Sequence, residues 1–119
     1  MIDASVLTQK RREYAILLKS SVNVIVNKLS GMEQVERISL FGSYARGKED
    51  LFTDLDVLVI MRTDLDFVER LRFLYSKMAV PVDLDLLCYT PEEWENLKTR
   101  PFFRGALQAE KVVYEKKRS

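Results

Sequence analysis

The 119-residue sequence predicts an α/β fold in which a mixed β-sheet of three to five strands is flanked by helices. Three observations lead to this class. A long helical periodicity opens the chain, β-forming runs follow at regular intervals, and segments with helix-start signals separate those runs. A hydrophobic content of 47% is enough for a packed core. We expect one domain over residues 1–119, with an N-terminal helix at about 6–30 and a core at about 35–115.

The first element is a helix from about Val6 to Leu29. Its apolar residues recur at spacings of three and four, which places them on one helix face: Leu7, Tyr14, Leu18, Val22, Ile25 and Leu29. Gly31 is a natural stop for this helix. The basic run 10–12 is expected on the exposed N-terminal half.

Two strands with a turn between them come next. Residues 35–41 read as a short strand that ends at Gly42, and residues 43–46 can form a helical turn closed by Gly47. Residues 55–61 (Leu-Asp-Val-Leu-Val-Ile-Met) form a strongly β-forming run and are expected to be a central strand.

The second half of the chain alternates helices and strands. Thr63 is expected to cap a helix over 64–78, and Pro81 to begin a strand over 82–89. The sequence Thr90-Pro91-Glu92-Glu93 is a capping box with proline at the first helical position, which predicts a helix to about Lys98. The remaining expected elements are a helix from Pro101 to about Ala109 and an edge strand over 111–115.

The composition excludes several chemistries. The chain has no histidine, which rules out Ser-His-Asp and Cys-His catalysis and His-ligated zinc. The lone Cys88 cannot form an intrachain disulfide, so a cytoplasmic location is expected. A net charge of +1 argues against stable nucleic-acid binding, and no apolar run is long enough to span a membrane.

The tripeptide Asp-Leu-Asp occurs three times, at 54–56, 64–66 and 83–85. Residues two apart on a strand point to the same face, so the strand copies at 54–56 and 83–85 each bring two carboxylates together. The copy at 64–66 opens a helix, where its carboxylates are expected to stabilise the helix start. If the two strands are neighbours, three or four carboxylates converge, and such oxygen ligands favour Mg²⁺ or Mn²⁺.

A glycine turn precedes the first carboxylate pair. Gly42 and Ser43 stand where a strand passes into a short helix, a place where backbone N–H groups can bind an anion. A phosphate-binding turn beside a divalent-metal pair is what nucleotidyl or phosphoryl transfer requires.

These residues resemble a known signature. They are similar to the signature of the DNA polymerase β-like nucleotidyltransferase superfamily, which has a Gly-Ser pair after a hydrophobic residue and an Asp-hydrophobic-Asp motif further on. Here the first part is Leu40-Phe41-Gly42-Ser43-Tyr44-Ala45-Arg46-Gly47. Ten residues separate Ser43 from the second part, Asp54-Leu55-Asp56. Thr53 stands where that family often has serine. The strand at 82–89, the capping box and the ending Glu110-Lys111-Val112-Val113-Tyr114 resemble its minimal, MNT-type branch.

The resemblance implies a site and a reaction. Gly42 and Ser43 would bind the triphosphate of ATP or another NTP, while Asp54 and Asp56 would bind Mg²⁺ and act as catalytic residues. A third carboxylate on the neighbouring strand would complete the set, and Asp85 fits this position better than Asp83. Arg46 could reach a phosphate, or could be an exposed charge. An acceptor hydroxyl would attack the α-phosphate and release pyrophosphate.

The acceptor stays open at this stage. Minimal members of the family are often paired with helical HEPN proteins in toxin–antitoxin modules, where they resemble antitoxins that transfer AMP to the toxin. That is our leading hypothesis. Because the chain has little beyond the catalytic core, the part of the site that binds the acceptor would come from this partner or from a second copy of the chain. A small-molecule nucleotidyltransferase and a non-catalytic antitoxin or binding subunit are the alternatives.

Outside the signature, three aromatic residues and the cysteine are expected to serve packing. Trp94, Phe102 and Phe103 are better explained as core or interface residues than as base-stacking platforms. Cys88 alternates with the carboxylates of its strand, so it should face the opposite side of the sheet.

Overall fold

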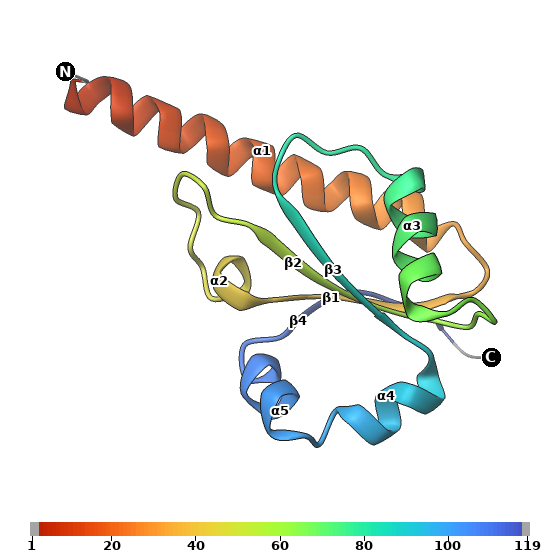
Figure 1. Cartoon of the computed structure of the whole chain (residues 1–119). Helices are drawn as coiled ribbons and strands as arrows, with labels where there is room; N and C mark the ends of the chain where they lie inside the picture. The colour runs from red at the N-terminus through yellow and green to blue at the C-terminus, as the bar shows by residue number, and fades with distance from the viewer. Residues whose placement is uncertain (1–2, 118–119) are drawn as a thin grey trace.

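The computed structural model describes residues 3–117 and contains a four-stranded sheet with helices on both faces (Figure 1). The elements in chain order are α1 (Ala4–Ser30), β1 (Val35–Phe41), α2 (Gly42–Ala45), β2 (Leu55–Met61), α3 (Phe67–Lys77), β3 (Leu84–Tyr89), α4 (Pro91–Leu97), α5 (Pro101–Leu107) and β4 (Lys111–Glu115). Helices α1 and α3 lie on one face of the sheet, and α4 and α5 lie on the other. The predicted fold class is confirmed.

The sheet is mixed, and β2 is one of its two inner strands. The strand order is β3-β2-β1-β4. Strand β2 pairs antiparallel with β1 and parallel with β3, while β4 adds an antiparallel edge to β1. In this register Asp56 lies opposite Phe41 on one side and opposite Asp85 on the other.

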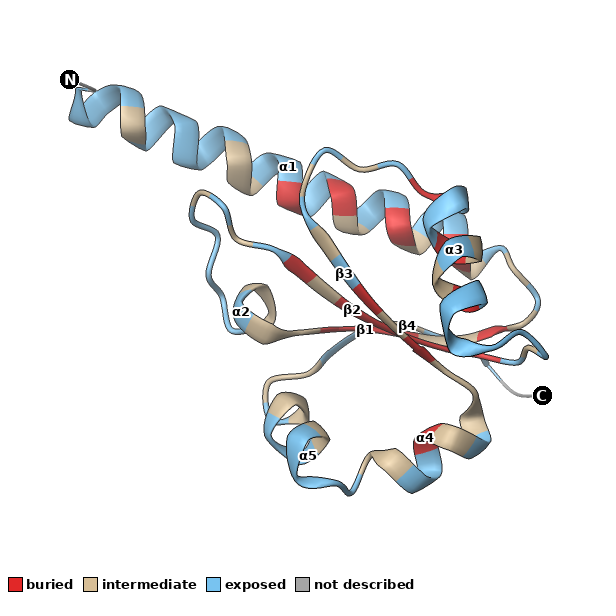
Figure 2. Cartoon of the chain, in the orientation of Figure 1, coloured by how far each residue is buried: buried red, intermediate tan, exposed pale blue. Residues whose placement is uncertain are grey.

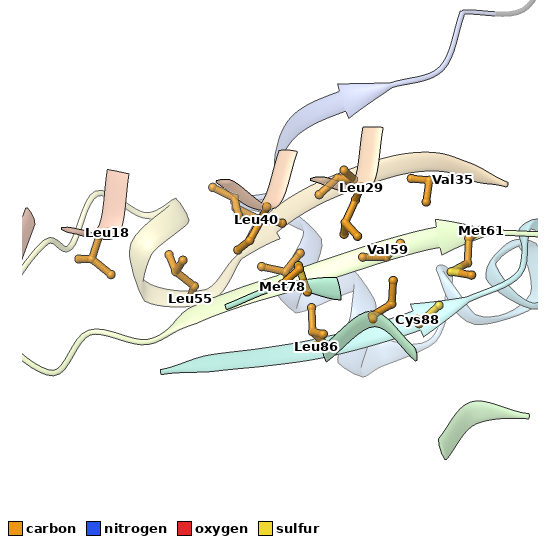
Figure 3. Packing of buried hydrophobic residues seen from close by; sticks show 14 residues of the cluster. Leu18, Leu29, Val35, Leu40, Leu55, Val59, Met61, Met78, Leu86 and Cys88 are labelled. Atoms are coloured by element: carbon orange, nitrogen blue, oxygen red, sulfur yellow. The ribbon is translucent and has the colours of Figure 1, made fainter. Parts of the chain in front are cut away.

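Alternate residues of β2 enter two separate apolar clusters. Val57 and Val59 are fully buried in the larger cluster, which α1 and α3 complete (Figure 3). Leu58 and Ile60 pack with Trp94 of α4 in the smaller cluster on the opposite face. Because side chains alternate along a strand, Asp56 continues the row of Leu58 and Ile60 and lies on the face that carries α4 and α5.

Helix α1 is anchored by its C-terminal half. Leu18, Ile25 and Leu29 are buried against the sheet, as their spacing predicts, whereas the N-terminal half extends beyond the sheet and is exposed (Figure 2). The helix ends at Ser30, and Gly31 is its C-terminal cap, as predicted. The φ of Gly31 is −76°, so this cap has a right-handed helical conformation. Within residues 3–117, α1 and the other helices lack the length or apolar character needed to cross a membrane.

Three predicted boundaries are wrong. Helix α3 begins at Phe67, because the Asp66 side chain accepts a hydrogen bond from the Glu69 N–H at 2.9 Å and acts as the cap. Thr63 instead accepts from the Leu65 N–H in the preceding loop. Strand β3 begins two residues later than expected, at Leu84, which lies opposite Leu55 at the start of β2. Helix α5 ends at Leu107.

The capping box of α4 is confirmed and carries a further contact. The Thr90 hydroxyl accepts from the Glu93 N–H at 3.2 Å, and the Glu93 carboxylate accepts from the Thr90 N–H at 2.9 Å. The same carboxylate forms a bidentate pair with the buried Arg70 of α3, at 2.6 and 3.2 Å. This pair holds the pKa of Glu93 below its ordinary value and joins the helices of opposite faces around the end of β3.

Replacing Glu93 with alanine should destabilise the fold by about 2 kcal/mol, because it removes the cap and leaves the buried Arg70 guanidinium without its carboxylate. Chemical denaturation monitored by circular dichroism measures the loss. The neighbouring Glu92 is exposed in the same helical turn, so Glu92→Ala should change stability by less than about 0.5 kcal/mol. Equal effects of the two substitutions would contradict this role of the pair.

Candidate active site

The predicted phosphate-binding turn lies at the end of β1. The chain leaves Phe41 in an extended conformation and enters the four-residue helix α2 through Gly42, whose φ is +71°. The first N–H groups of a helix have no partner within the helix and remain available to an anion. Gly47, which also has a positive φ (+92°), turns the chain away after α2.

Gly42 is required by its contact with Asp56. A Cβ atom built on Gly42 would lie 2.0 Å from the Oδ2 atom of Asp56, and its φ is one that other residues rarely adopt. Gly47 shares the positive φ but has open space where a Cβ atom would be. The glycine turn and the second carboxylate of the signature are therefore in direct contact, although fourteen positions separate them in the sequence.

Two carboxyl groups from adjacent strands meet beside this turn, and the charge of a third acts on them. Asp54 lies just before β2 and is exposed, Asp56 lies within β2 and is half-buried, and Asp85 lies opposite Asp56 on β3. Burial raises the pKa of Asp56 from 3.8 to about 6, helped by the charges of Asp85 and Asp54 and by a side-chain hydrogen bond with Asp85. Parallel pairing thus places Asp85, the residue favoured from the sequence, next to Asp56.

The position of Asp83 differs from that of Asp85. The Asp83 carbonyl accepts a hydrogen bond from the Leu55 N–H at 2.9 Å, so its backbone extends the pairing of the two strands. Its side chain lines a separate hollow with Tyr14, and its charge raises the pKa of the Tyr14 hydroxyl, an effect second to burial.

The carboxyl groups fit a divalent cation as a partial ligand set. The ion pairs within residues 3–117 include none with Asp54, Asp56 or Asp85, so in this part of the chain no basic side chain is in direct contact with these carboxyl groups. In the same part of the chain, no three acidic or thiol groups are close enough to form a complete metal cage. Mg²⁺ is commonly held by one or two carboxylates together with substrate phosphates, which is the arrangement this site would offer.

A hollow of about 240 Å³ joins the turn to the carboxylates. Its lining includes Ser43, Asp54 and Asp56, and also Lys48 and Phe52. Lys48 is held near the turn by a hydrogen bond from its N–H to the Ser43 carbonyl at 3.1 Å. Arg46 is exposed at the C-terminal end of α2 and is not part of this lining.

Three residues near this site were not identified from the sequence as site residues: Lys48, Phe52 and Tyr14. The Tyr14 hydroxyl donates to the Thr53 carbonyl at 3.0 Å, while the Arg11 guanidinium pairs with Asp50 at 3.0 Å. Helix α1 therefore braces the segment that leads into Asp54. Lys48 lies between the two parts of the signature, and only its positive charge could have indicated from the sequence that it contributes to a phosphate site. Tyr14 follows the helix periodicity and reads as a packing residue.

The other predictions about single residues have mixed outcomes. Cys88 is fully buried on the face opposite Asp56, and burial raises its pKa to about 12. Trp94 is buried and Phe103 is half-buried against it, as expected of core residues, whereas Phe102 is 67% exposed. A larger hollow of about 630 Å³, lined by Arg37, Trp94 and Glu115 among others, lies beyond the opposite end of β2. It lacks the glycine turn and the paired carboxylates.

A family model described as polymerase beta, nucleotidyltransferase matches residues 23–119, which include the glycine turn, both strands and all three carboxylates. The chain belongs to this family. The nucleotidyltransferase predicted from the signature is thereby confirmed at the level of the family.

Relatives of this nucleotidyltransferase support the same fold. A protein from Methanocaldococcus jannaschii, named as a "putative protein adenylyltransferase", is 33% identical over 99 residues, which are 82% of this chain and 94% of that protein. The crystal structure of a "putative nucleotidyltransferase" from Sulfolobus solfataricus superposes with a TM-score of 0.57 at 16% identity, covering 92% of this chain and 87% of the other. The crystal structure of a mutant form of the toxin–antitoxin MntA-HpeT gives a TM-score of 0.52 at 20% identity, with coverages of 82% and 72%.

Substituting Asp56 with asparagine should stabilise the metal-free protein at neutral and alkaline pH. Because the pKa of Asp56 is raised from 3.8 to about 6, its contribution to stability is complete below about pH 4 and is lost as the pH rises through 6. The asparagine side chain would carry no charge, so we expect a gain of about 1 kcal/mol at pH 8, after allowance for solvent screening, that disappears towards pH 4.

Thermal unfolding in EDTA between pH 4 and 8 measures this gain. Asp64→Asn is the matched control, because Asp64 belongs to the exposed Asp-Leu-Asp copy between β2 and α3. A variant of Asp56 that follows the wild-type curve at every pH would show that ionisation of Asp56 does not destabilise the metal-free fold.

Gly42→Ala should cost at least about 1 kcal/mol more than Gly47→Ala. Both substitutions force alanine into a positive φ, but only the first drives a methyl group into Asp56. Urea denaturation of the two variants in EDTA provides the comparison. Equal losses would mean that the backbone conformation alone, and not the contact with Asp56, requires glycine at position 42.

Proposed function

We propose that this nucleotidyltransferase transfers AMP from ATP to a hydroxyl group of a protein. The register that places Asp56 between Phe41 and Asp85 carries the proposal, because it brings the glycine turn that we expect to bind phosphate next to the paired carboxyl groups of Asp56 and Asp85. The relative from Methanocaldococcus jannaschii supports both the nucleotide and the class of acceptor, since its name describes a protein adenylyltransferase and the match covers 94% of it.

The residues of the site divide into two sets. Gly42 and Ser43 would hold the triphosphate through backbone N–H groups, and Lys48 would add a positive charge to the same hollow. Arg46 stays a candidate for the outer part of the triphosphate. Asp54, Asp56 and Asp85 would hold Mg²⁺ or Mn²⁺, which supplies charge neutralisation and a lower pKa for the attacking hydroxyl.

The reaction follows from these positions. The acceptor oxygen forms a bond with the α-phosphorus of ATP, the bond from that phosphorus to the oxygen bridging to the β-phosphorus breaks, pyrophosphate leaves with that oxygen, and the hydroxyl proton passes to solvent. The turn orients the triphosphate for in-line attack. Asp85 lies on β3, an edge strand of the sheet, and we expect the acceptor to approach from that edge.

The partner we propose is a helical HEPN-type toxin that this protein modifies and neutralises. The likeness to the fold of the MntA-HpeT toxin–antitoxin structure supports this choice. A second copy of the chain is the other candidate for completing the acceptor side of the site.

Incubation with α-labelled ATP, Mg²⁺ and the candidate toxin tests the proposal: label should pass to the toxin with release of pyrophosphate. Asp85→Asn should reduce this transfer at least about a hundredfold, whereas Asp83→Asn should reduce it less than about fivefold. The two residues are only two positions apart, but Asp85 lies opposite Asp56 within the paired strands, whereas Asp83 precedes β3 and lines a separate hollow with Tyr14.

The other outcomes separate the alternatives. An Asp56→Ala variant that neutralises the toxin as well as wild type would identify a binding subunit without chemistry. Label that passes to a small molecule and never to protein would identify a small-molecule nucleotidyltransferase. Equal losses from Asp83→Asn and Asp85→Asn would contradict the assignment of the third carboxylate.

A further inference from the structure

Phe52 has a conformation and an exposure that the fold itself does not require. It is the one non-glycine residue within 3–117 that has a positive φ (+64°), and its side chain is 86% exposed. It occupies the third position of a four-residue turn closed by a hydrogen bond from the Thr53 N–H to the Asp50 carbonyl at 3.2 Å. Glycine or asparagine usually takes a positive φ at such a position.

The turn that carries Phe52 is fixed at both ends. The Asp50 carboxylate accepts hydrogen bonds from the Leu51 N–H at 2.8 Å and from the Arg11 guanidinium at 3.0 Å. The Thr53 carbonyl accepts from the Tyr14 hydroxyl at 3.0 Å. The aromatic ring is therefore presented by a braced turn rather than by a loose segment.

Phe52 stands at the rim of the hollow that contains the site. It lines this hollow together with Ser43, Lys48 and Asp56. At about 240 Å³ the hollow is smaller than the roughly 300–1,000 Å³ typical of ligand pockets, so it can hold only part of a nucleoside triphosphate. With the phosphates at the glycine turn and the carboxylates, the nucleoside has to lie across the rim.

We propose that Phe52 is the platform on which the nucleobase of the bound triphosphate stacks. The inference rests on the proposed function and adds to it the residue that holds the nucleoside end of the substrate. Every base has a flat face that can stack on an aromatic ring, so Phe52 contributes affinity without selecting one base. The strained, exposed ring is then covered only when the nucleotide is bound.

Binding of Mg–ATP and of Mg–tripolyphosphate, measured by calorimetry without an acceptor, tests this role. Phe52→Gly should weaken ATP binding about tenfold and leave tripolyphosphate binding unchanged, because the phosphate contacts are retained. Glycine also suits the positive φ, so this variant should fold as well as wild type. Phe52→Trp should retain ATP affinity, and its added indole fluorescence should respond to ATP but not to tripolyphosphate.

Phe102→Ala serves as the control, since Phe102 is another exposed aromatic residue and lies on α5. Unchanged ATP binding by Phe52→Gly would overturn the proposal, as would an equal loss of ATP and tripolyphosphate binding. An effect on the affinity for a protein acceptor alone would overturn it in favour of acceptor binding. Failure of the wild-type protein to bind either ligand would instead refute the proposed function itself.

Discussion

The pairing of β2 with strands of opposite direction is the constraint from which the site arises. Its antiparallel neighbour β1 ends at Phe41, opposite Asp56, so the glycine turn that follows β1 lies beside Asp56. Its parallel neighbour β3 begins nearby and places Asp85 opposite the same residue. Either neighbour alone would leave one part of the site missing. The two apolar clusters, one on each face, fix this register, because a shift by one residue would exchange the faces of Val57 and Leu58.

The site works against the stability of the metal-free fold. Asp56 is half-buried among two other acidic groups, and its raised pKa reflects a charge that the protein alone accommodates poorly. The positive φ at Phe52 adds local strain. Contacts elsewhere offset this loss of folding free energy, among them the buried residues of β2 and the Arg70–Glu93 pair. Functional residues in many proteins show this separation between groups that stabilise and groups that act.

Sequence reasoning predicted the features that depend on local pattern. The strand over 55–61, the capping box at Thr90 and the face of α1 follow from periodicity and from side chains that bond their own backbone. The start of β3 depends on its pairing register with β2, and no local pattern contains that register. Lys48 and Phe52 were missed for a related reason: they belong to an irregular segment whose path is set by contacts with Arg11 and Tyr14, about forty positions earlier.

The contact between Gly42 and Asp56 has a consequence for how this protein can vary. Because the methyl group of an alanine at position 42 would occupy the place of the Asp56 carboxylate, the two positions are energetically coupled. A chain that had already exchanged Asp56 for a smaller residue would avoid this clash, and a side chain at position 42 would then meet only the penalty of its positive φ. Loss of the acidic group would thus open a path to loss of the glycine, and descendants that abandoned chemistry could fill the turn while keeping the fold.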